Sequence, residues 1–180
     1  MFIGGDLQSP SIMNTQTKVI AMSIITEGVD VKTVCTFKGG MRFDSEVRGH
    51  NVVMDAKAEF GGTNQGPSPK EYVLAGMCGC TGMDVVSLLK KMRVEYGKFY
   101  INADAELTNG HPSVFSVIKI DYLFDNVVSL VESKEKIIKS VTMSMSKYCG
   151  VSAMLAKTAQ IKLRIIVDNS TIFEGDAVFT

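Results

Sequence analysis

The chain has 180 residues, of which 46% are hydrophobic and 21% charged, which is the composition of an ordinary globular domain. Its 19 basic and 19 acidic side chains balance, so it lacks the basic excess that is typical of nucleic-acid-binding proteins. Its apolar runs are shorter than the roughly 18 residues of a membrane span. We therefore expect neither a nucleic-acid partner nor a membrane partner.

The N-terminal residues differ from the rest of the chain. Residues 1–28 combine glycine, proline and small polar residues with one short apolar stretch, which indicates an extension ahead of a domain at residues 29–180. The first 16 residues lack the basic start and the continuous apolar run of a signal peptide. We therefore expect a cytoplasmic protein, and in that compartment thiols stay reduced.

The four cysteines do not form a pattern typical of a metal site. They stand at positions 35, 78, 80 and 149, without a CxxC motif, and the chain has only two histidines. This inventory argues against structural zinc. We expect neither a metal nor an organic cofactor.

The predicted domain begins with three strands. Residues 31–37, VKTVCTF, alternate with a period of two, and residues 41–47 and 51–60 follow after short turns that contain glycine. This pattern predicts a β-meander with tight connections.

A long apolar helix is predicted next. Ser68 and Pro69 form a typical helix start, and the pattern continues to Arg93, where three basic residues close the helix. Its apolar positions cover most of the circumference, which predicts a central, buried helix. Such a helix is too apolar for the surface of a monomer, and this indicates a dimer.

The second half predicts two strand pairs that flank helices. A hairpin is expected from residues 99–107 and 114–124, because the connection contains Asn-Gly and proline. An amphipathic helix at 127–147, with Val131 facing inward, and a short helix at 151–159 follow. Two more strands complete the chain, at residues 160–168 and 172–179. Strands and helices occur in blocks, so the fold class is α+β.

The residues alone leave the role of the thiols open. A cysteine within a helix is most often an inert core residue, and this reading is kept for Cys35 and Cys78. Cys149 stands at a helix break, where a helix N-terminus favours the thiolate. A pair of Cys80 and Cys149 would allow a sulfenic acid on one thiol to condense with the other, if the fold brings them together. Arg42 is a candidate cation for the thiolate.

Two motifs make this hypothesis specific. The segment GPSPKEYVLAGMCGCTGMDVVSLLKKMR, followed downstream by SKYCGVSAML, resembles the OsmC/Ohr family of osmotically inducible and organic-hydroperoxide-resistance proteins, in its OsmC-like branch. The resemblance implies an intertwined homodimer with long central helices packed against antiparallel sheets. It also implies a cysteine-based peroxidase that reduces organic hydroperoxides with the help of a thiol or dithiol reductant.

The resemblance further implies roles for single residues. Cys80 matches the peroxidatic cysteine, Cys149 the resolving cysteine and Arg42 the arginine that pairs with the reactive thiolate. In the family's peroxidases a glutamate follows the helix-starting proline and holds the arginine, whereas this chain has Lys70 there and Glu71 one position later. A shift of one residue rotates a side chain by about 100° around a helix. Glu71 is the candidate substitute for that glutamate.

Two other function classes stay open. The first is a non-catalytic, stress-associated dimer that binds a small molecule and uses Cys80 only for packing, which Lys70 favours. The second is a thiol enzyme of another kind, such as a hydrolase or a redox sensor.

Overall fold

The computed structural model describes residues 31–179, which fall into two compact units divided after Gly66. The N-terminal extension predicted for residues 1–28 lies outside the described residues, as does the predicted domain boundary at residue 29. A single domain over residues 29–180 therefore stays a prediction. The mixed α+β class is confirmed, since two sheets and several helices make up the described residues.

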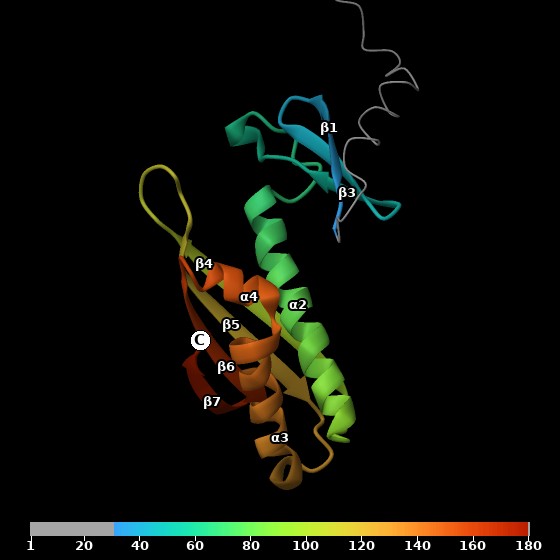
Figure 1. Cartoon of the computed structure of the whole chain (residues 1–180), viewed down its shortest axis with the longest axis vertical. Coiled ribbons are helices and arrows are strands. Elements are labelled where there is room, and N and C mark those ends of the chain that lie inside the picture. Colours follow the sequence, from blue (N-terminus) through green and yellow to red (C-terminus); the bar gives the residue numbers. More distant parts are fainter. Residues whose placement is uncertain (1–30, 180) are drawn as a thin grey trace, which may run out of the picture. The chain divides into compact units, whose positions relative to one another are not determined.

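The first unit contains a three-stranded antiparallel sheet, which confirms the predicted meander. Its strands are β1 (Val34–Gly39), β2 (Arg42–Val47) and β3 (His50–Met54), in that order across the sheet (Figure 1). The turn between β1 and β2 is tight because Gly39 and Gly40 adopt positive φ angles of 103° and 56°.

The third strand is shorter than the predicted residues 51–60. It ends at Met54, and Ala58–Phe60 form a single 3-10 turn, η1. Asp55 stabilises the change of direction, because the residue is only 2% exposed and its carboxylate accepts three backbone N–H bonds from the following loop. A strand cannot continue where the chain folds back around a carboxylate in this way.

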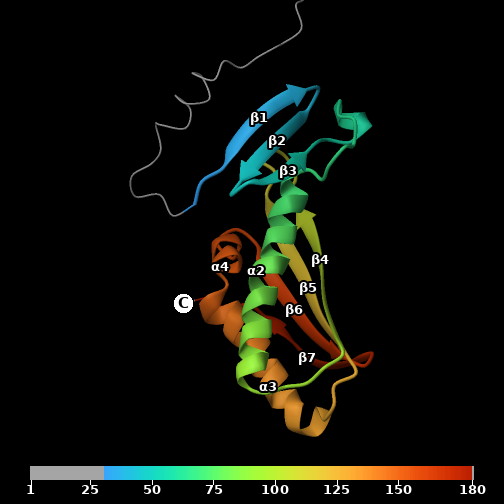
Figure 2. The ribbon, with the colours of Figure 1, turned by 90° about the vertical axis from the view of Figure 1, so that its right-hand side faces the viewer.

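The second unit places its helices on one side of a four-stranded sheet (Figure 2). Its strand order is β4-β5-β6-β7. The elements in chain order are α2 (Pro69–Lys91), β4 (Lys98–Leu107), β5 (Phe115–Asp125), α3 (Leu130–Met143), η2 (Ser144–Tyr148), α4 (Gly150–Leu155), β6 (Gln160–Val167) and β7 (Ser170–Asp176).

The strand pairing confirms the predicted hairpin and corrects one expectation. Strands β4 and β5 pair in antiparallel fashion, as do β6 and β7. Strands β5 and β6, however, run parallel, so this sheet is mixed and not purely antiparallel. The chain between them crosses the sheet through α3, η2 and α4, and a crossover of this kind returns the chain in its original direction.

The core of the second unit lies between its sheet and its helices. Alternate residues of β5 and β6 face the helices and are at most 3% exposed: Ile118, Ile120, Tyr122, Phe124, Ile161, Leu163, Ile165 and Val167. Helix α2 contributes a narrow stripe at helical spacing, Met77, Thr81, Val85 and Leu89. Ile137 and Val141 of α3 complete this core.

Helix α2 begins as predicted but is not buried on all sides. Ser68 caps it in a capping box with Glu71, and Pro69 is its first residue. The face opposite the buried stripe is exposed, with Met83 at 72% and Val86 at 43%. The prediction of a helix buried all round is therefore wrong for a single chain.

Helix α2 is as long and as apolar as many membrane-spanning helices. Among residues 31–179 it is the one helix long and apolar enough to cross a membrane. A core helix of a globular protein passes the same test, and the buried stripe of α2 packs against the sheet.

The second long helix is shorter than predicted and ends in an unusual turn. Helix α3 stops at Met143, and Ser144–Tyr148 form a π-helical turn before Cys149. Val131, which was predicted to face inward, is 92% exposed. It lies two residues before the buried Ser133, which places it about 200° away around the helix.

Candidate active site

Helix α2 carries two thiols on different faces. Cys78 and Cys80 are two residues apart, so their side chains point about 200° apart around the helix. Both are partly buried, and Cys78 packs against the core. Burial raises the pKa of the Cys78 thiol, which favours its protonated form.

The thiol of Cys149 lies in a buried, hydrogen-bonded position. Cys149 is 0% exposed and is the N-cap residue of α4. Its sulfur accepts a hydrogen bond from the hydroxyl of Ser152 at 3.0 Å and another from the backbone N–H of Ser152 at 3.4 Å. The predicted position of Cys149 at a helix break is therefore confirmed.

The structure brings Cys80 and Cys149 together. Burial raises the pKa of the Cys149 thiol, the bonds from Ser152 lower it, and the neighbouring Cys80 thiol raises it. The two residues are 69 positions apart in the sequence and become neighbours because α2 packs against η2 and α4. All four cysteines are free thiols.

Arg42 lies on β2 in the first unit and is held by its own sheet and loop. Its Nε donates to Oδ1 of Asp44 at 2.8 Å and its Nη2 to Oδ2 at 3.0 Å, which is a two-pronged ion pair. Its Nη1 donates to the side-chain oxygen of Gln65. The hydrogen bond between the two side chains is the largest cause that raises the pKa of Arg42 and lowers that of Asp44.

Asp55 organises the loop that presents Gln65. Its carboxylate accepts the backbone N–H of Gln65 at 3.1 Å and both the N–H and the hydroxyl of Thr63, at 3.0 and 2.8 Å. These bonds, with the one from Gln65 as the largest cause, lower the pKa of Asp55 to about 2. Arg42 therefore rests on a loop whose own conformation is fixed.

Glu71 takes part in capping α2. Its carboxylate accepts the backbone N–H of Ser68 at 2.6 Å, while Lys70 donates to the hydroxyl of Ser113 at 3.1 Å. Glu71 belongs to the second unit and Arg42 to the first. The pairing of Glu71 with Arg42 stays a prediction.

Comparison with known proteins places this arrangement in a family. The family model described as "OsmC-like protein" matches residues 62–164, which is more than half of the chain. Protein YhfA of Escherichia coli K12 is 30% identical over 123 residues, which cover 68% of this chain and 87% of that protein. The chain belongs to the OsmC-like family.

Solved structures show the same fold. A hypothetical protein from Aquifex aeolicus has a TM-score of 0.67 at 24% identity and covers 77% of this chain and 96% of its own. An organic hydroperoxide resistance protein OsmC from Legionella pneumophila has a TM-score of 0.55 at 14% identity, over 76% of this chain and 98% of its own. At these identities the likeness supports the OsmC-like fold alone.

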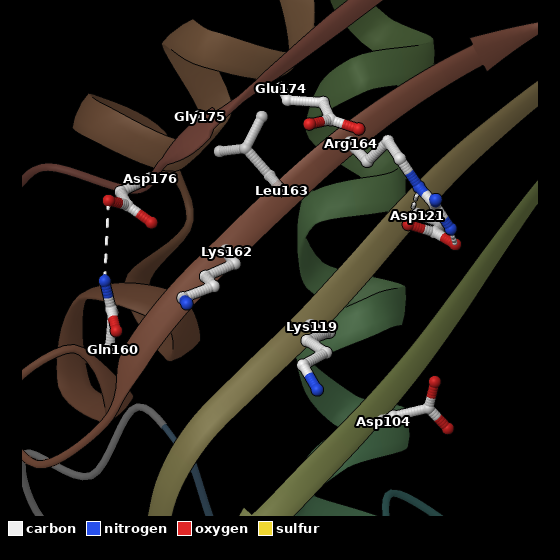
Figure 3. Close-up of a pocket in the computed structure, with 10 residues that line it drawn as sticks. All are labelled: Asp104, Lys119, Asp121, Gln160, Lys162, Leu163, Arg164, Glu174, Gly175 and Asp176. Atoms are coloured by element: carbon white, nitrogen blue, oxygen red, sulfur yellow. Dashed lines mark hydrogen bonds and ion pairs between the residues drawn. The ribbon is translucent and has the colours of Figure 1, made fainter. Parts of the chain in front are cut away.

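A charged groove lies on the outer face of the four-stranded sheet of this OsmC-like chain, with a volume of about 550 Å³. Figure 3 shows that its charged side chains come from all four strands. Arg164 forms an ion pair with Asp121 at 2.6 Å, and Gln160 contacts Asp176 at 3.5 Å. The groove contains none of the cysteines, and within it Arg164 and Asp121 balance each other's charge.

Three residues around the candidate site were not predicted from the sequence. Asp44 stands two residues after Arg42 on one strand, and this spacing puts both side chains on the same face, so it was a readable signal. Gln65 and Ser152 carry no signal of this kind. Their roles depend on loop geometry and on the position of a hydroxyl.

We predict that replacing Ser152 with alanine raises the pKa of Cys149 further. The substitution removes the hydroxyl that donates to the sulfur at 3.0 Å and so destabilises the thiolate. The pKa is measured from thiolate absorbance in a chain whose other three cysteines are serine. Ser133→Ala, which removes another buried hydroxyl at the start of α3, is the control and should leave the titration unchanged. An unchanged titration in Ser152→Ala contradicts this account of Cys149.

We predict that Asp55 makes the free energy of unfolding decrease at acidic pH. Its folded-state pKa of about 2 lies below the value of about 4 in an unfolded chain, so its contribution is complete above pH 4 and disappears as the pH falls toward 2. Asp55→Asn should lower the denaturation midpoint at pH 7 and flatten its change between pH 4 and 2. Asp104→Asn, at an exposed position, is the control. A variant as stable as wild type at pH 7 would show that the carboxylate bonds are unimportant.

Proposed function

We propose that this OsmC-like protein is a thiol peroxidase that reduces organic hydroperoxides, with Cys80 as the attacking and Cys149 as the resolving cysteine. The observation that carries the proposal is that a partly exposed thiol lies near enough to a fully buried one to raise its pKa. A partly exposed thiol can meet a peroxide from solvent, whereas the buried thiol is protected from it. The proposal agrees with the names of structural neighbours that are organic hydroperoxide resistance proteins.

The proposed cycle has three balanced steps. The Cys80 thiolate attacks the distal oxygen of the hydroperoxide, the O–O bond breaks, and the alkoxide takes a proton to leave as an alcohol. Cys80 is now a sulfenic acid. The sulfur of Cys149 attacks it, and the hydroxyl group leaves with the thiol proton as water, which forms a disulfide. A dithiol then reduces this disulfide by exchange and is itself oxidised.

Arg42 is assigned to the first step. A guanidinium stays charged and offers several donors in one plane, which suits it to stabilise a thiolate and a departing oxygen. Its bonds to Asp44 and Gln65 fix its orientation, so the arginine does not need a glutamate at position 70 to be held. Glu71, near the start of α2, stays in the proposal as the candidate substitute for that glutamate.

We also propose that the protein acts as a homodimer in which α2 contacts a second copy of the chain. The exposed face of α2 carries Val73, Met83 and Val86, which are between 43% and 72% exposed. Exposed apolar side chains along one side of a helix favour an association surface there. A second copy is the occupant that the family resemblance implies.

Two observations favour the alternative of a non-catalytic binding protein. The ammonium of Lys70 replaces the glutamate of the family's peroxidases, and the charge of Arg42 is balanced by Asp44. A neutralised guanidinium stabilises a thiolate less strongly than a free one. Activity measurements separate the two functions.

We expect the wild-type protein to consume cumene hydroperoxide when a dithiol is supplied. Cys80→Ser should abolish consumption because the attacking sulfur is lost, and Cys78→Ser should retain most of it because Cys78 points elsewhere on α2. Peptide mass spectrometry after one equivalent of peroxide should find a link between residues 80 and 149. In Cys149→Ser, a sulfenic-acid probe should label Cys80. Equal rates in wild type and Cys80→Ser would refute the peroxidase.

We expect the protein to sediment at twice its chain mass of 19.6 kDa. Met83→Glu should weaken the dimer, because it places a charge in an apolar contact that cannot pair it. Lys134→Glu, the same kind of charge change at an exposed position of α3, away from the exposed face of α2, is the control. A wild-type monomer at micromolar concentration, measured by analytical ultracentrifugation, would contradict the proposed dimer.

A further inference from the structure

A group of buried hydroxyls beside the two thiols takes no part in the cycle described above. Ser144, the first residue of the π-helical turn, is 0% exposed and makes contacts in two directions. Its carbonyl accepts the backbone N–H of Cys149 at 3.0 Å. Its hydroxyl donates to the carboxylate of Asp84 at 2.9 Å and lies 2.8 Å from the hydroxyl of Thr81. Ser144 therefore connects the backbone of Cys149 to helix α2.

The direction of these hydrogen bonds follows from the number of protons. Ser144 has one hydroxyl proton and gives it to Asp84, so it accepts the proton of Thr81. Thr81 has then used its own proton and accepts from the hydroxyl of Tyr122, 2.7 Å away. Burial raises the pKa of Tyr122 far above its usual range, so Tyr122 keeps its proton and remains a donor. The chain of bonds runs one way, from Tyr122 to Asp84.

This series of hydrogen bonds joins three elements of the fold at one point. Tyr122 belongs to β5, Thr81 and Asp84 to α2, and Ser144 to the π-helical turn. Thr81 directly follows Cys80 in α2, and the carbonyl of Ser144 accepts the backbone N–H of Cys149, so the junction is linked through the backbone to both cysteines. A hydroxyl in an apolar core is unfavourable unless it is bonded, and each of these hydroxyls is bonded.

The π-helical turn links this junction to the position of Cys149. A π turn is rare and inserts an extra residue into a helix, which changes where the following residues lie. The turn from Ser144 to Tyr148 sets the position from which Cys149 approaches α2. The bonds of Ser144 to Thr81 and Asp84 fix the start of that turn against α2.

We propose that Ser144 is a positioning residue that holds Cys149 against Cys80 through Thr81 and Asp84. The inference rests on the proposed function for its role in catalysis, but its physical content is the tendency of the two thiols to form a disulfide. A junction that holds the sulfurs close raises their effective concentration toward each other. Its loss lowers that tendency even where the fold persists.

The test is a thiol–disulfide equilibrium on the full chain with Cys35 and Cys78 replaced by serine. Oxidised dithiothreitol accepts two electrons from Cys80 and Cys149, which form a disulfide while dithiothreitol becomes reduced. The equilibrium constant is obtained from the bridged fraction after acid quenching and mass spectrometry. Ser144→Ala should lower this constant about tenfold, as expected for the loss of one or two buried hydrogen bonds.

Three further variants make the result specific. Ser144→Thr keeps the hydroxyl and should restore the constant to within about threefold of the parent, allowing for one added methyl group. Thr81→Val removes the middle hydroxyl while keeping the shape and should also lower the constant. Ser140→Ala is the matched control, because Ser140 is a buried serine of α3 whose hydroxyl donates to the carbonyl of Ile137, within its own helix. Circular dichroism checks that each variant is folded.

The outcomes separate this inference from the proposed function. Equal constants for Ser144→Ala, Thr81→Val and Ser140→Ala overturn the positioning role, even if the protein consumes hydroperoxides. A specific drop in the first two, with recovery in Ser144→Thr, supports it, even if no hydroperoxide is consumed. If Ser144→Ala does not fold, Thr81→Val and Ser144→Thr decide in the same way. A parent chain that forms no bridge between residues 80 and 149 overturns both.

Discussion

The narrow buried stripe of α2 is the constraint on which the thiol pair depends. Met77, Thr81, Val85 and Leu89 fix the rotation of the helix, because they are the residues of α2 that pack fully into the core. With that rotation set, Cys80 stands beside the stripe, partly exposed, on the side where Cys149 arrives. Cys78 is turned to a different side by the same rotation. The difference between the two cysteines follows from helix geometry and not from their local sequence.

Thr81 is the polar residue of this stripe. Three of its four residues are apolar and would allow the helix to slide or rotate slightly at small cost. The hydroxyl of Thr81 has partners on β5 and on the π-helical turn, and a shifted helix would leave three hydroxyls unbonded. Buried polar networks are costly when they are only partly satisfied, so they specify one arrangement. The junction therefore fixes the register of the packing that the apolar contacts drive.

Much of the fold could be predicted from the sequence, since its signals are local. Ser68-Pro69 marked the start of α2, and alternation marked the strands of both sheets. The failures have physical reasons. The strand after residue 51 ended early because Asp55 turns the chain, and no alternation pattern contains that information. Parallel pairing of β5 with β6 depends on the path of the crossover, and the exposed face of α2 depends on what else is present to cover it.

The site was predictable only where a family motif or a helix break marked it. Cys80 and Cys149 could be named from the sequence, but only the family resemblance implied that they lie close together, because their proximity arises from packing between residues 69 positions apart. Thr81, Ser144 and Tyr122 read as ordinary core positions. The Asp55 loop that supports Gln65 is likewise invisible until the chain is folded.

The role proposed for Arg42 raises the question of how a guanidinium whose charge is balanced by a carboxylate could serve the proposed reaction. Arg42 and Asp44 form a pair of zero net charge, so the long-range attraction of the guanidinium for a thiolate is weak. The guanidinium nevertheless has five N–H donors, and its three bonds to Asp44 and Gln65 use three of them. Two donors remain in a plane whose orientation is fixed. Such a group acts through directed hydrogen bonds more than through charge, and directed bonds favour an anion only where it meets the donors. An arginine held in this way stabilises an anion only in the position that its N–H donors face. This suits a step in which negative charge develops on one particular oxygen.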